Sequence, residues 1–435
     1  MQTQTVHSES DVQTIECANC DAVLPVDANY VTWCDRCGWN LQPQEVRRPR
    51  NLFEYLYASA GIKLSKSLFD EMVSAESLRP VWTMSKVLAF LCAAAIHALT
   101  VGFALLGLAL IIREWPAIIL VAAGLLCLGV AWLLRPIPAR CPEGVLPRGS
   151  FPTLYGVADE ISRQLGAPTL DSIAIDSIFN AYFMHAGWRR RPTMCLGLPL
   201  LSILSGPERV GLMAHEIAHG VNGDPFRGFF VGSAVDSLIS WHVLLRPDRL
   251  WEPGVGFFMA LALVPINLLA LGLSEVALLM ANALIHLSWL VSQRAEYLAD
   301  YLAASVAGTE AVLALLDKLH FVGAFECTVL RASLNWDRQK QDVFEELRKE
   351  IGQMPERELE RLRRVKQMES SRLDVTHPPT TYRLRLLAAH PMPHPKLTLP
   401  PEVFDRLDCE LATLKGETQE KLLDQQRASL YRRYR

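Results

Sequence analysis

The chain has 435 residues, and half of them are apolar, which is enough for several folded domains and for membrane-spanning segments. A formal net charge of −3 gives no reason to expect a nucleic-acid partner. Ten cysteines are few for this length, which argues against a disulfide-rich scaffold. Residues 1–13 are polar and lack the apolar core of a secretory signal, so we expect the soluble parts in the cytosol.

Two CxxC pairs lie near the start of the chain: Cys17 with Cys20, and Cys34 with Cys37. Four thiolates at this spacing form a closed tetrahedral zinc site, although the two pairs are slightly closer together than in most zinc ribbons. A closed site leaves no position for water, so this zinc is expected to be structural. A redox role for the pairs is the alternative, but one metal ion explains two matched pairs better. We predict a zinc ribbon over residues 1–45.

Residues 46–135 contain the first segments that are expected to meet a membrane. A polar linker and amphipathic helices are predicted over 46–82, and these helices could lie at a membrane interface or pack against a core. The apolar runs at 87–112 and 116–134 are each long enough to cross a bilayer of about 30 Å. Positive residues flank both outer ends, so residues 83–135 predict a transmembrane hairpin whose ends face the cytosol.

Residues 148–225 are expected to form a folded domain with a small β-sheet. Three strand-like stretches follow a helix there, at residues 172–175, 178–185 and 193–198. The edge of this sheet is expected to lie along the helix that comes next. An edge strand can pair with an extended peptide through its backbone. We assign this substrate-binding role to four consecutive residues: Asn180, Ala181, Tyr182 and Phe183.

The last helix of this domain carries an HExxH motif, formed by His215, Glu216 and His219. Start signals at residues 205–208 and stop signals at residues 220–225 indicate a short, bounded helix. On such a helix the two imidazoles lie one turn apart on one face and can bind the same metal ion. Zinc held by neutral imidazoles activates a water molecule, and Glu216 is placed to take its proton, as peptide-bond hydrolysis requires. A chance match on a surface helix is the alternative.

A catalytic zinc ion usually takes three protein ligands, so the two histidines need a partner. The best candidate lies in residues 293–325, where a second helix carries Glu296 and, one turn later, Asp300. We assign Glu296 as the third ligand. A carboxylate at the position of Asp300 is well placed to accept the free N–H of a ligating histidine and to fix its tautomer. An ordinary solvated helix face is the alternative.

Three apolar stretches separate the two zinc motifs: residues 226–245, 255–274 and 276–292. Because Glu296 and the histidines must meet on one side of a membrane, an even number of crossings is required. We favour one span at 226–245 and a long second helix that begins near Val255, crosses, and continues into the active site. The alternative leaves 226–245 in the interface and forms a hairpin that turns at residues 272–275. In both layouts residues 226–292 contain a second transmembrane pair.

These motifs resemble those of the integral-membrane HExxH zinc metallopeptidases typified by the heat-shock protease HtpX and the CAAX prenyl endopeptidase. The resemblance rests on HEIAH at residues 215–219 and on SQRAEYLAD at residues 292–300. Asn-Ala-Tyr-Phe at residues 180–183 is similar to the family's Asn-Ala-Phe strand beside the cleft, although Tyr182 interrupts the usual sequence. The resemblance covers roughly residues 150–390.

A late His-Pro element extends this resemblance, because His377 is followed by two prolines and then by Arg383. The resemblance implies that both residues lie near the metal, where they would offset the charge of a tetrahedral oxyanion. This element opens residues 376–435, which end in a basic tail that could touch anionic lipid. Residues 326–375 are dense in both charge signs and predict an exposed helical insertion, as a flap, a partner surface or a solvated face.

The sequence therefore predicts a mainly α-helical, polytopic protein of the cell inner membrane, with a gluzincin-like zinc metallopeptidase domain, a small β-sheet and an N-terminal zinc ribbon. The catalytic domain and the ribbon are expected to face the cytoplasm. The resemblance implies zinc-dependent cleavage of membrane-associated or misfolded proteins. The alternative is an inactive membrane scaffold that recruits partners through its ribbon. Metal content separates them, because the enzyme needs a catalytic and a structural zinc ion and the scaffold only the structural one.

Overall fold

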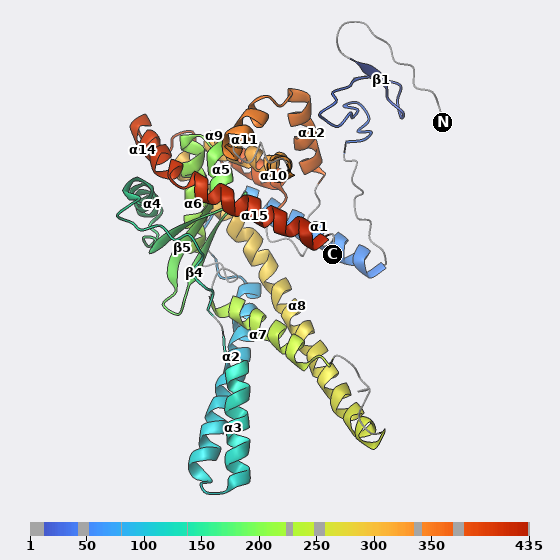
Figure 1. Ribbon diagram of the computed structural model, residues 1–435, viewed down its shortest axis with the longest axis vertical. Coiled ribbons are helices and arrows are strands. Elements are labelled where there is room, and N and C mark those ends of the chain that lie inside the picture. Colours follow the sequence, from blue (N-terminus) through green and yellow to red (C-terminus); the bar gives the residue numbers. More distant parts are fainter. Residues whose placement is uncertain are drawn as a thin grey trace.

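The computed structural model describes residues 13–41, 52–79, 81–136, 138–222, 229–247, 257–334, 342–368 and 378–433. Most of these residues are helical, as predicted, and the strands form two small sheets. Figure 1 shows a head that contains the larger sheet and two helical arms that leave the head on the same side. The N-terminal strands lie at the side of the head, away from the larger sheet (Figure 1).

The N-terminal ribbon, defined here as residues 13–41, contains two short antiparallel strands, β1 (Thr14–Glu16) and β2 (Val23–Pro25). Its apolar core consists mainly of Cys17, Leu24 and Cys34. A core this small does not stabilise a fold without a metal ion or another cross-link. The four predicted cysteines are therefore needed for the ribbon to keep its shape.

The first arm is the predicted helical hairpin, formed by α2 (Met84–Arg113) and α3 (Ile118–Leu133). The two helices approach most closely at two glycines, because a Cβ on Gly107 would lie 2.8 Å from the carbonyl oxygen of Gly124. Large apolar side chains cover the outside of the hairpin, and Leu105 and Leu126 are 62% and 70% exposed. The hairpin therefore presents an apolar surface that the protein itself does not cover.

The second arm pairs α7 (Phe229–Leu245) with α8 (Phe257–Ala307), a continuous helix of 51 residues. At 1.5 Å per residue α8 is about 75 Å long, which is enough to cross a bilayer and still reach deep into the head. Figure 1 shows α8 running from the tip of the arm into the head. The alternative layout with a turn at residues 272–275 is wrong, because α8 passes through these residues without interruption.

Among the described residues, two helical segments are long and apolar enough to cross a membrane: Met84–Arg113 and Leu261–Ala307. Only 17% and 22% of their most apolar windows are buried within the protein. The core helix of a soluble protein would be mostly buried, so this apolar surface favours a lipid environment.

The larger sheet has three strands, β3 (Ser172–Asp176), β4 (Ala181–Ala186) and β5 (Arg191–Gly197), in the order β3-β5-β4. The central strand β5 is parallel to β3 and antiparallel to β4, so β4 is an edge strand. The main core lies between this sheet, α4 (Pro152–Leu165) and α6 (Gly206–Asn222), with Ile161, Met194 and Ile217 among its buried side chains. At the end of β5 only glycine fits, because a Cβ on Gly197 would lie 1.8 Å from the carbonyl oxygen of Ile178.

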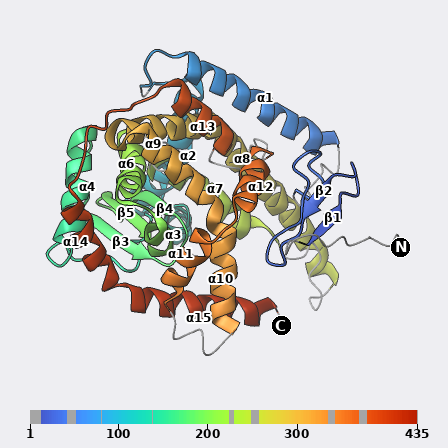
Figure 2. The same cartoon turned by 90° about the horizontal axis from the view of Figure 1, so that it is seen from above.

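Nine shorter elements complete the described part of the head: α5 (Leu198–Ile203), α9 (Thr309–Lys318), η1 (Leu319–Phe321), α10 (Val322–Leu334), α11 (Val343–Gly352), α12 (Glu356–Gln367), α13 (Thr380–Ala389), α14 (Pro401–Ala412) and α15 (Lys415–Arg433). Residues 52–74 form a single helix, α1 (Leu52–Ser74), rather than the predicted pair. Its buried residues Leu68 and Met72 pack in one cluster with Tyr297 of α8 and Leu386 of α13. Figure 2 shows α1 crossing one edge of the head.

The prediction of an exposed insertion at residues 326–375 is wrong for its first half. In α11, Val343, Phe344 and Leu347 are fully buried. Val343 and Leu347 pack with Leu422 and Leu423 of α15, so this helix belongs to the folded head. The prediction relied on the high proportion of charged residues. These charges lie on the outer face of α11, and the proportion alone does not reveal that the opposite face is apolar.

Candidate metal centre

Helix α6 holds the HExxH motif in a fixed place within the core. Its start follows the predicted signals, since the backbone N–H of Ser205 donates to Glu208 Oε2 at 2.7 Å, as in a capping box. Glu208 Oε2 also accepts from Lys318 Nζ at 2.6 Å, which ties the start of α6 to the end of α9. Ala214 and Ile217 are buried on both sides of the motif. The histidines therefore project from a helix that is anchored at its start and along its length.

The structure brings together His215, His219 and Glu296, which the sequence assigned to one metal ion. The two histidine Nε2 atoms are 3.3 Å apart, and Glu296 places Oε2 3.5 Å from His215 Nε2 and Oε1 3.4 Å from His219 Nε2. Ligand atoms about 2.0–2.1 Å from a tetrahedral zinc ion are about 3.4 Å apart, so each imidazole lies at the spacing of a zinc site from the other imidazole and from one oxygen of the Glu296 carboxylate. All three side chains are buried, and two imidazoles with one carboxylate are a donor set of catalytic zinc.

Asp300 lies directly behind the first histidine. His215 Nδ1 is 3.0 Å from Asp300 Oδ1, so this carboxylate favours the tautomer whose Nε2 lone pair faces the other two ligand atoms. Arg383 of α13 donates to the same carboxylate with two hydrogen bonds, Nε to Oδ2 at 2.7 Å and Nη2 to Oδ1 at 2.6 Å. Asp300 is therefore fixed from both sides.

The buried charges around the centre shift one another's pKa values. Burial would lower the pKa of His215, but the carboxylates of Asp300 and Glu296 outweigh burial and raise this pKa when no metal ion is bound. Burial would raise the pKa of Asp300, yet the Arg383 guanidinium holds it below its usual range. Burial likewise opposes the charge on Arg383, while Asp300, Glu296 and Glu216 raise its pKa further above the ordinary value. Asp300 and Arg383 thus stay ionised.

This balance of charge suits a bound cation. Glu216, Glu296 and Asp300 are all buried, with 4%, 1% and 0% of their surface exposed. In the described part of the centre, the only buried guanidinium that meets these three carboxylates is that of Arg383. Buried carboxylates are stable when a counter-charge lies close by, and a divalent metal ion between the three ligand atoms supplies it.

The predicted peptide-binding residues lie at the sheet edge next to α6. Phe183 is buried, and its ring reaches the end of α6, where a Cβ on Gly220 would lie only 3.1 Å from Phe183 Cζ. Tyr182 faces the other side of the sheet, where burial and the neighbouring Cys195 raise the pKa of its hydroxyl. Asn180 is exposed and its carbonyl oxygen accepts from the N–H of Gly197 at 2.8 Å. The edge strand and the HExxH helix are thus in direct contact.

The four ribbon cysteines also gather around one point. Cys17 Sγ lies 3.6 Å from Cys37 Sγ, and Cys20 Sγ lies 3.5 Å from Cys34 Sγ. All four sulfur atoms lie within 4.8 Å of one another, which fits a tetrahedral metal ion held by thiolates. The backbone N–H of Trp39 stabilises the thiolate of Cys37 and lowers its pKa to about 6. The set of ligands is the one predicted from the two CxxC pairs.

The distances above do not test one predicted residue, His377, and they include one contact that was not predicted. His377 lies outside the described residues. The double hydrogen bond between Asp300 and Arg383 was not predicted, because the two residues are 83 positions apart and no spacing pattern connects them. Only the resemblance of the His-Pro element pointed to Arg383. It implied that Arg383 acts on an oxyanion, whereas the structure places its guanidinium on Asp300.

Comparison with known proteins agrees with this geometry. Residues 152–390 match the model of "Peptidase family M48". The chain is similar to Protease HtpX of Pseudomonas paraeruginosa (26% identity over 178 residues, 38% of this chain and 56% of the relative). It is also similar to Protease HtpX of Pseudomonas putida (28% over 173 residues, 38% and 55%) and of Stutzerimonas stutzeri (25% over 175 residues, 38% and 56%). No solved structure matches the chain.

The chain spans about half the length of the curated relatives that it matches. The family match covers more than half of this chain and includes the larger sheet, the HExxH helix, Glu296, Asp300 and Arg383. Two buried imidazoles and a carboxylate that could hold one metal ion are consistent with a metallopeptidase family. The chain belongs to peptidase family M48, as an HtpX-like metallopeptidase.

Proposed function

We propose that the protein is a zinc-dependent endopeptidase, with its catalytic zinc held by His215, His219 and Glu296. One observation carries this proposal: the two histidine Nε2 atoms are 3.3 Å apart, each lies 3.4–3.5 Å from one oxygen of the buried Glu296 carboxylate, and the Asp300 carboxylate orients His215. Zinc in this place supplies a Lewis acid for activating water and polarising a peptide carbonyl. The remaining steps belong to side chains of the protein.

Glu216 is the proposed general base. It lies in the same turn of α6 as the ligands and is buried beside them. It takes a proton from the attacking water and returns it to the leaving amine. Asp300 fixes the tautomer of His215, and Arg383 holds Asp300 in place and keeps it ionised. We therefore assign Arg383 a positioning role through Asp300, while the role of His377 beside an oxyanion stays a prediction.

We propose that substrates bind as extended peptides along β4. Within the part of the chain that the structure describes, this strand pairs with β5 alone, so its other edge offers backbone groups for a further strand. Phe183 fixes β4 against the end of α6, next to the metal centre. The substrate backbone would then pair along Asn180, Ala181 and Tyr182 and lie beside the metal ligands.

The protein is proposed to work at the cytosolic face of the cell inner membrane. Both arms leave the head on one side, and their apolar side chains are exposed (Figure 1). At the head end of the first arm, Lys86 lies 4.8 Å from the ring of Trp82 and Arg135 lies 3.4 Å from the ring of Trp132. Tryptophan is enriched at both membrane interfaces, and an excess of positive residues favours the cytosolic one. Substrates would then be membrane-associated or misfolded proteins, as in quality control or processing.

The proposal is tested by Glu216→Gln in the full-length protein. The variant should keep both metal ions but lose cleavage of an unfolded protein substrate, because glutamine cannot accept the proton. Glu310→Gln, at an exposed position of α9, is the matched control and should cleave normally. Retained cleavage in the Glu216→Gln protein would refute the mechanism.

A measurement of the metal bound per chain distinguishes the endopeptidase from the rival function, an inactive scaffold. The scaffold predicts that only the ribbon holds a metal ion, whereas the endopeptidase needs a metal at both clusters. Cells that carry the wild-type chain or the Glu216→Gln chain should then differ in their membrane proteins. Proteins that accumulate uncut only with the variant would identify the substrates.

A further inference from the structure

One face of α12 is built from arginines that contact the ribbon. Arg357, Arg361 and Arg364 recur at helical spacing and therefore lie on one side of the helix. Each donates a hydrogen bond to a backbone carbonyl oxygen of the ribbon: Arg357 Nη2 to Trp33, Arg361 Nη1 to Leu41 at 2.9 Å, and Arg364 Nη1 to Asp35 at 2.7 Å. Figure 2 shows α12 next to the two ribbon strands.

The ribbon contributes an aromatic ring to the same contact. The guanidinium carbons of Arg357 and Arg364 lie 5.0 Å and 5.1 Å from the centre of the Trp33 ring. Trp33 is only 1% exposed, and its ring is thus covered by two cations. Arginine over an indole ring is a favourable cation–π contact, and it strengthens where water is excluded. The arginine face of α12, defined as Arg357, Arg361 and Arg364, therefore fits this one region of the ribbon by both charge and shape.

The three carbonyl groups depend on the second CxxC pair for their positions. Trp33 and Asp35 flank Cys34, and Leu41 follows shortly after Cys37. The turn that connects them is held by two backbone hydrogen bonds at 2.9 Å, from Cys34 N to Trp39 O and from Gly38 N to Cys34 O. In a ribbon with so small a core, the metal ion and the fold form together. Without metal, the carbonyl groups would not keep the arrangement that the arginines require.

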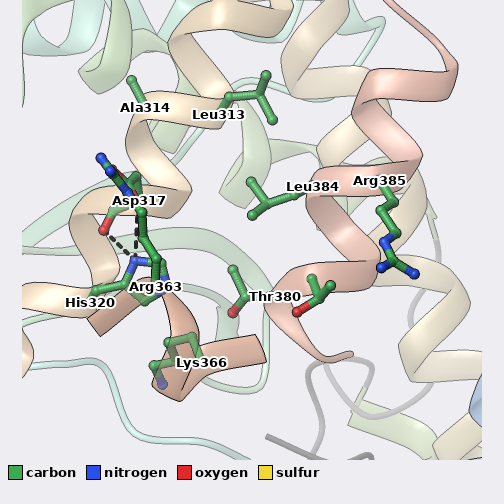
Figure 3. A pocket seen from close by; sticks show the side chains of 10 residues that line it. Leu313, Ala314, Asp317, His320, Arg363, Lys366, Thr380, Leu384 and Arg385 are labelled. Carbon is green, nitrogen blue, oxygen red and sulfur yellow. Dashed lines mark hydrogen bonds and ion pairs between the residues drawn. The ribbon is translucent and has the colours of Figure 1, made fainter. Parts of the chain in front are cut away.

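The other side of α12 is attached to the head. Arg363 donates to Asp317 of α9 through Nη2 at 2.8 Å and Nε at 3.1 Å. This pair borders a cavity of about 600 Å³ between α9, α12 and α13, into which Figure 3 shows Leu384 of α13 pointing. The helix α12 thus lies between the ribbon and the helices that border the metal centre. Among the described residues, α12 contacts the ribbon on one side and the head on the other.

We propose that the arginine face of α12 is a docking surface for the metal-loaded ribbon of the same chain, so that metal binding by the ribbon holds α12 on the head. The docked ribbon shields the arginines and limits the opening of α12. Loss of the ribbon metal releases the ribbon and leaves α12 held by its contacts with the head, among them the pair of Arg363 with Asp317. This proposal rests on the ribbon metal site of the proposed function and is independent of the cleavage chemistry.

The test is amide hydrogen exchange in residues 356–367 of the full chain in detergent. Two variants are compared with the wild type: Cys34→Ser with Cys37→Ser, which removes ribbon metal, and Arg357→Ala with Arg361→Ala and Arg364→Ala, which removes the docking face. We expect α12 to lose protection in both variants, while α4, residues 152–165, keeps it. The arginine variant should still hold two metal ions per chain and the cysteine variant one.

Arg348→Ala, at the partly exposed arginine of α11, is the control and should leave the exchange of α12 unchanged. Unchanged protection of α12 in the cysteine variant would overturn the dependence on metal. Unchanged protection in the arginine variant would overturn the docking surface itself. Cleavage of an unfolded substrate, measured on the same samples, reports separately on the catalytic proposal.

Discussion

Asp300 and Arg383 form a double hydrogen bond at 2.6 Å and 2.7 Å in the interior of the head, although 83 residues separate them in the chain. Both side chains are almost fully buried, and an isolated charge of either sign would be costly there. Each therefore needs the other. Because Asp300 also meets His215 Nδ1, this ion pair connects α13 to the metal centre.

The first prediction is that Asp300→Asn weakens zinc binding at the catalytic site. Asparagine has one acceptor oxygen where aspartate has two, so His215 and Arg383 would compete for it. Removing such an outer partner of a ligating histidine lowers metal affinity by roughly 10–100-fold. Competition with a chromophoric chelator measures this change. Asp317→Asn removes a similar pair with Arg363 away from the centre and should leave the affinity unchanged. An unaltered affinity in Asp300→Asn would contradict the assigned role of Asp300.

The second prediction concerns the close contact in the first arm. A Cβ on Gly107 would meet Gly124 O at 2.8 Å and Leu128 Cγ at 2.9 Å, so Gly107→Val must push α2 and α3 apart. Such overpacking costs about 1–3 kcal/mol. We expect a lower unfolding temperature in detergent for this variant. Gly102→Val in the same helix is the control, since nothing lies within 4 Å of its Cβ position. Equal unfolding temperatures for the two variants would show that the helices do not depend on this contact.

The third prediction is a pH-dependent helix cap in the head. Asp342 caps α11 by accepting from the N–H groups of Phe344 at 2.9 Å and Glu345 at 3.1 Å. Burial would raise its pKa, but these N–H groups and Lys415 lower it below the ordinary value. The carboxylate therefore stabilises the folded state fully above about pH 4, and this stability is lost as the pH falls through the folded-state pKa.

Two substitutions at Asp342 separate the cap from the charge. Asp342→Ala should lower the free energy of unfolding by about 1 kcal/mol at neutral pH, and the difference from wild type should shrink in acid. Asp342→Asn keeps an acceptor without a charge, so it should retain most of the stability and lose the dependence on pH. Thermal unfolding over a series of pH values checks both. A constant difference between wild type and Asp342→Ala across that series would contradict the prediction.

Local patterns allowed much of the site to be predicted from the sequence. His215 and His219 are one helical turn apart, and Cys34 and Cys37 belong to one tight turn, so their spacing alone determines that each pair can share a metal ion. The hairpin of α2 and α3 could also be predicted from the sequence, because its length and apolar composition are local properties.

The parts that sequence reasoning missed depend on contacts between distant segments. Arg361 donates to the carbonyl oxygen of Leu41, and a backbone acceptor leaves no signature in the identity of the residue that carries it. In the same way, the continuity of α8 through Pro265 could not be decided from periodicity, because that helix is apolar on all sides. The requirement that Glu296 reach the histidines did not decide the question either, because a turn at residues 272–275 and a continuous helix both give an even number of crossings.

The last prediction tests the contact between the edge strand and the HExxH helix. Gly220→Ala places a methyl group 3.1 Å from Phe183 Cζ, so the ring and the strand that carries it must move by a few tenths of an ångström. We expect KM for an unfolded protein substrate to rise, because β4 is the proposed site of backbone pairing, while metal content stays the same. A smaller side chain in Phe183→Leu should relieve the clash. The double variant should then recover more of the wild-type KM than Gly220→Ala alone, and this coupling, measured as a double-mutant cycle, isolates the contact. If KM is unaffected by Gly220→Ala, the peptide does not depend on the position of β4.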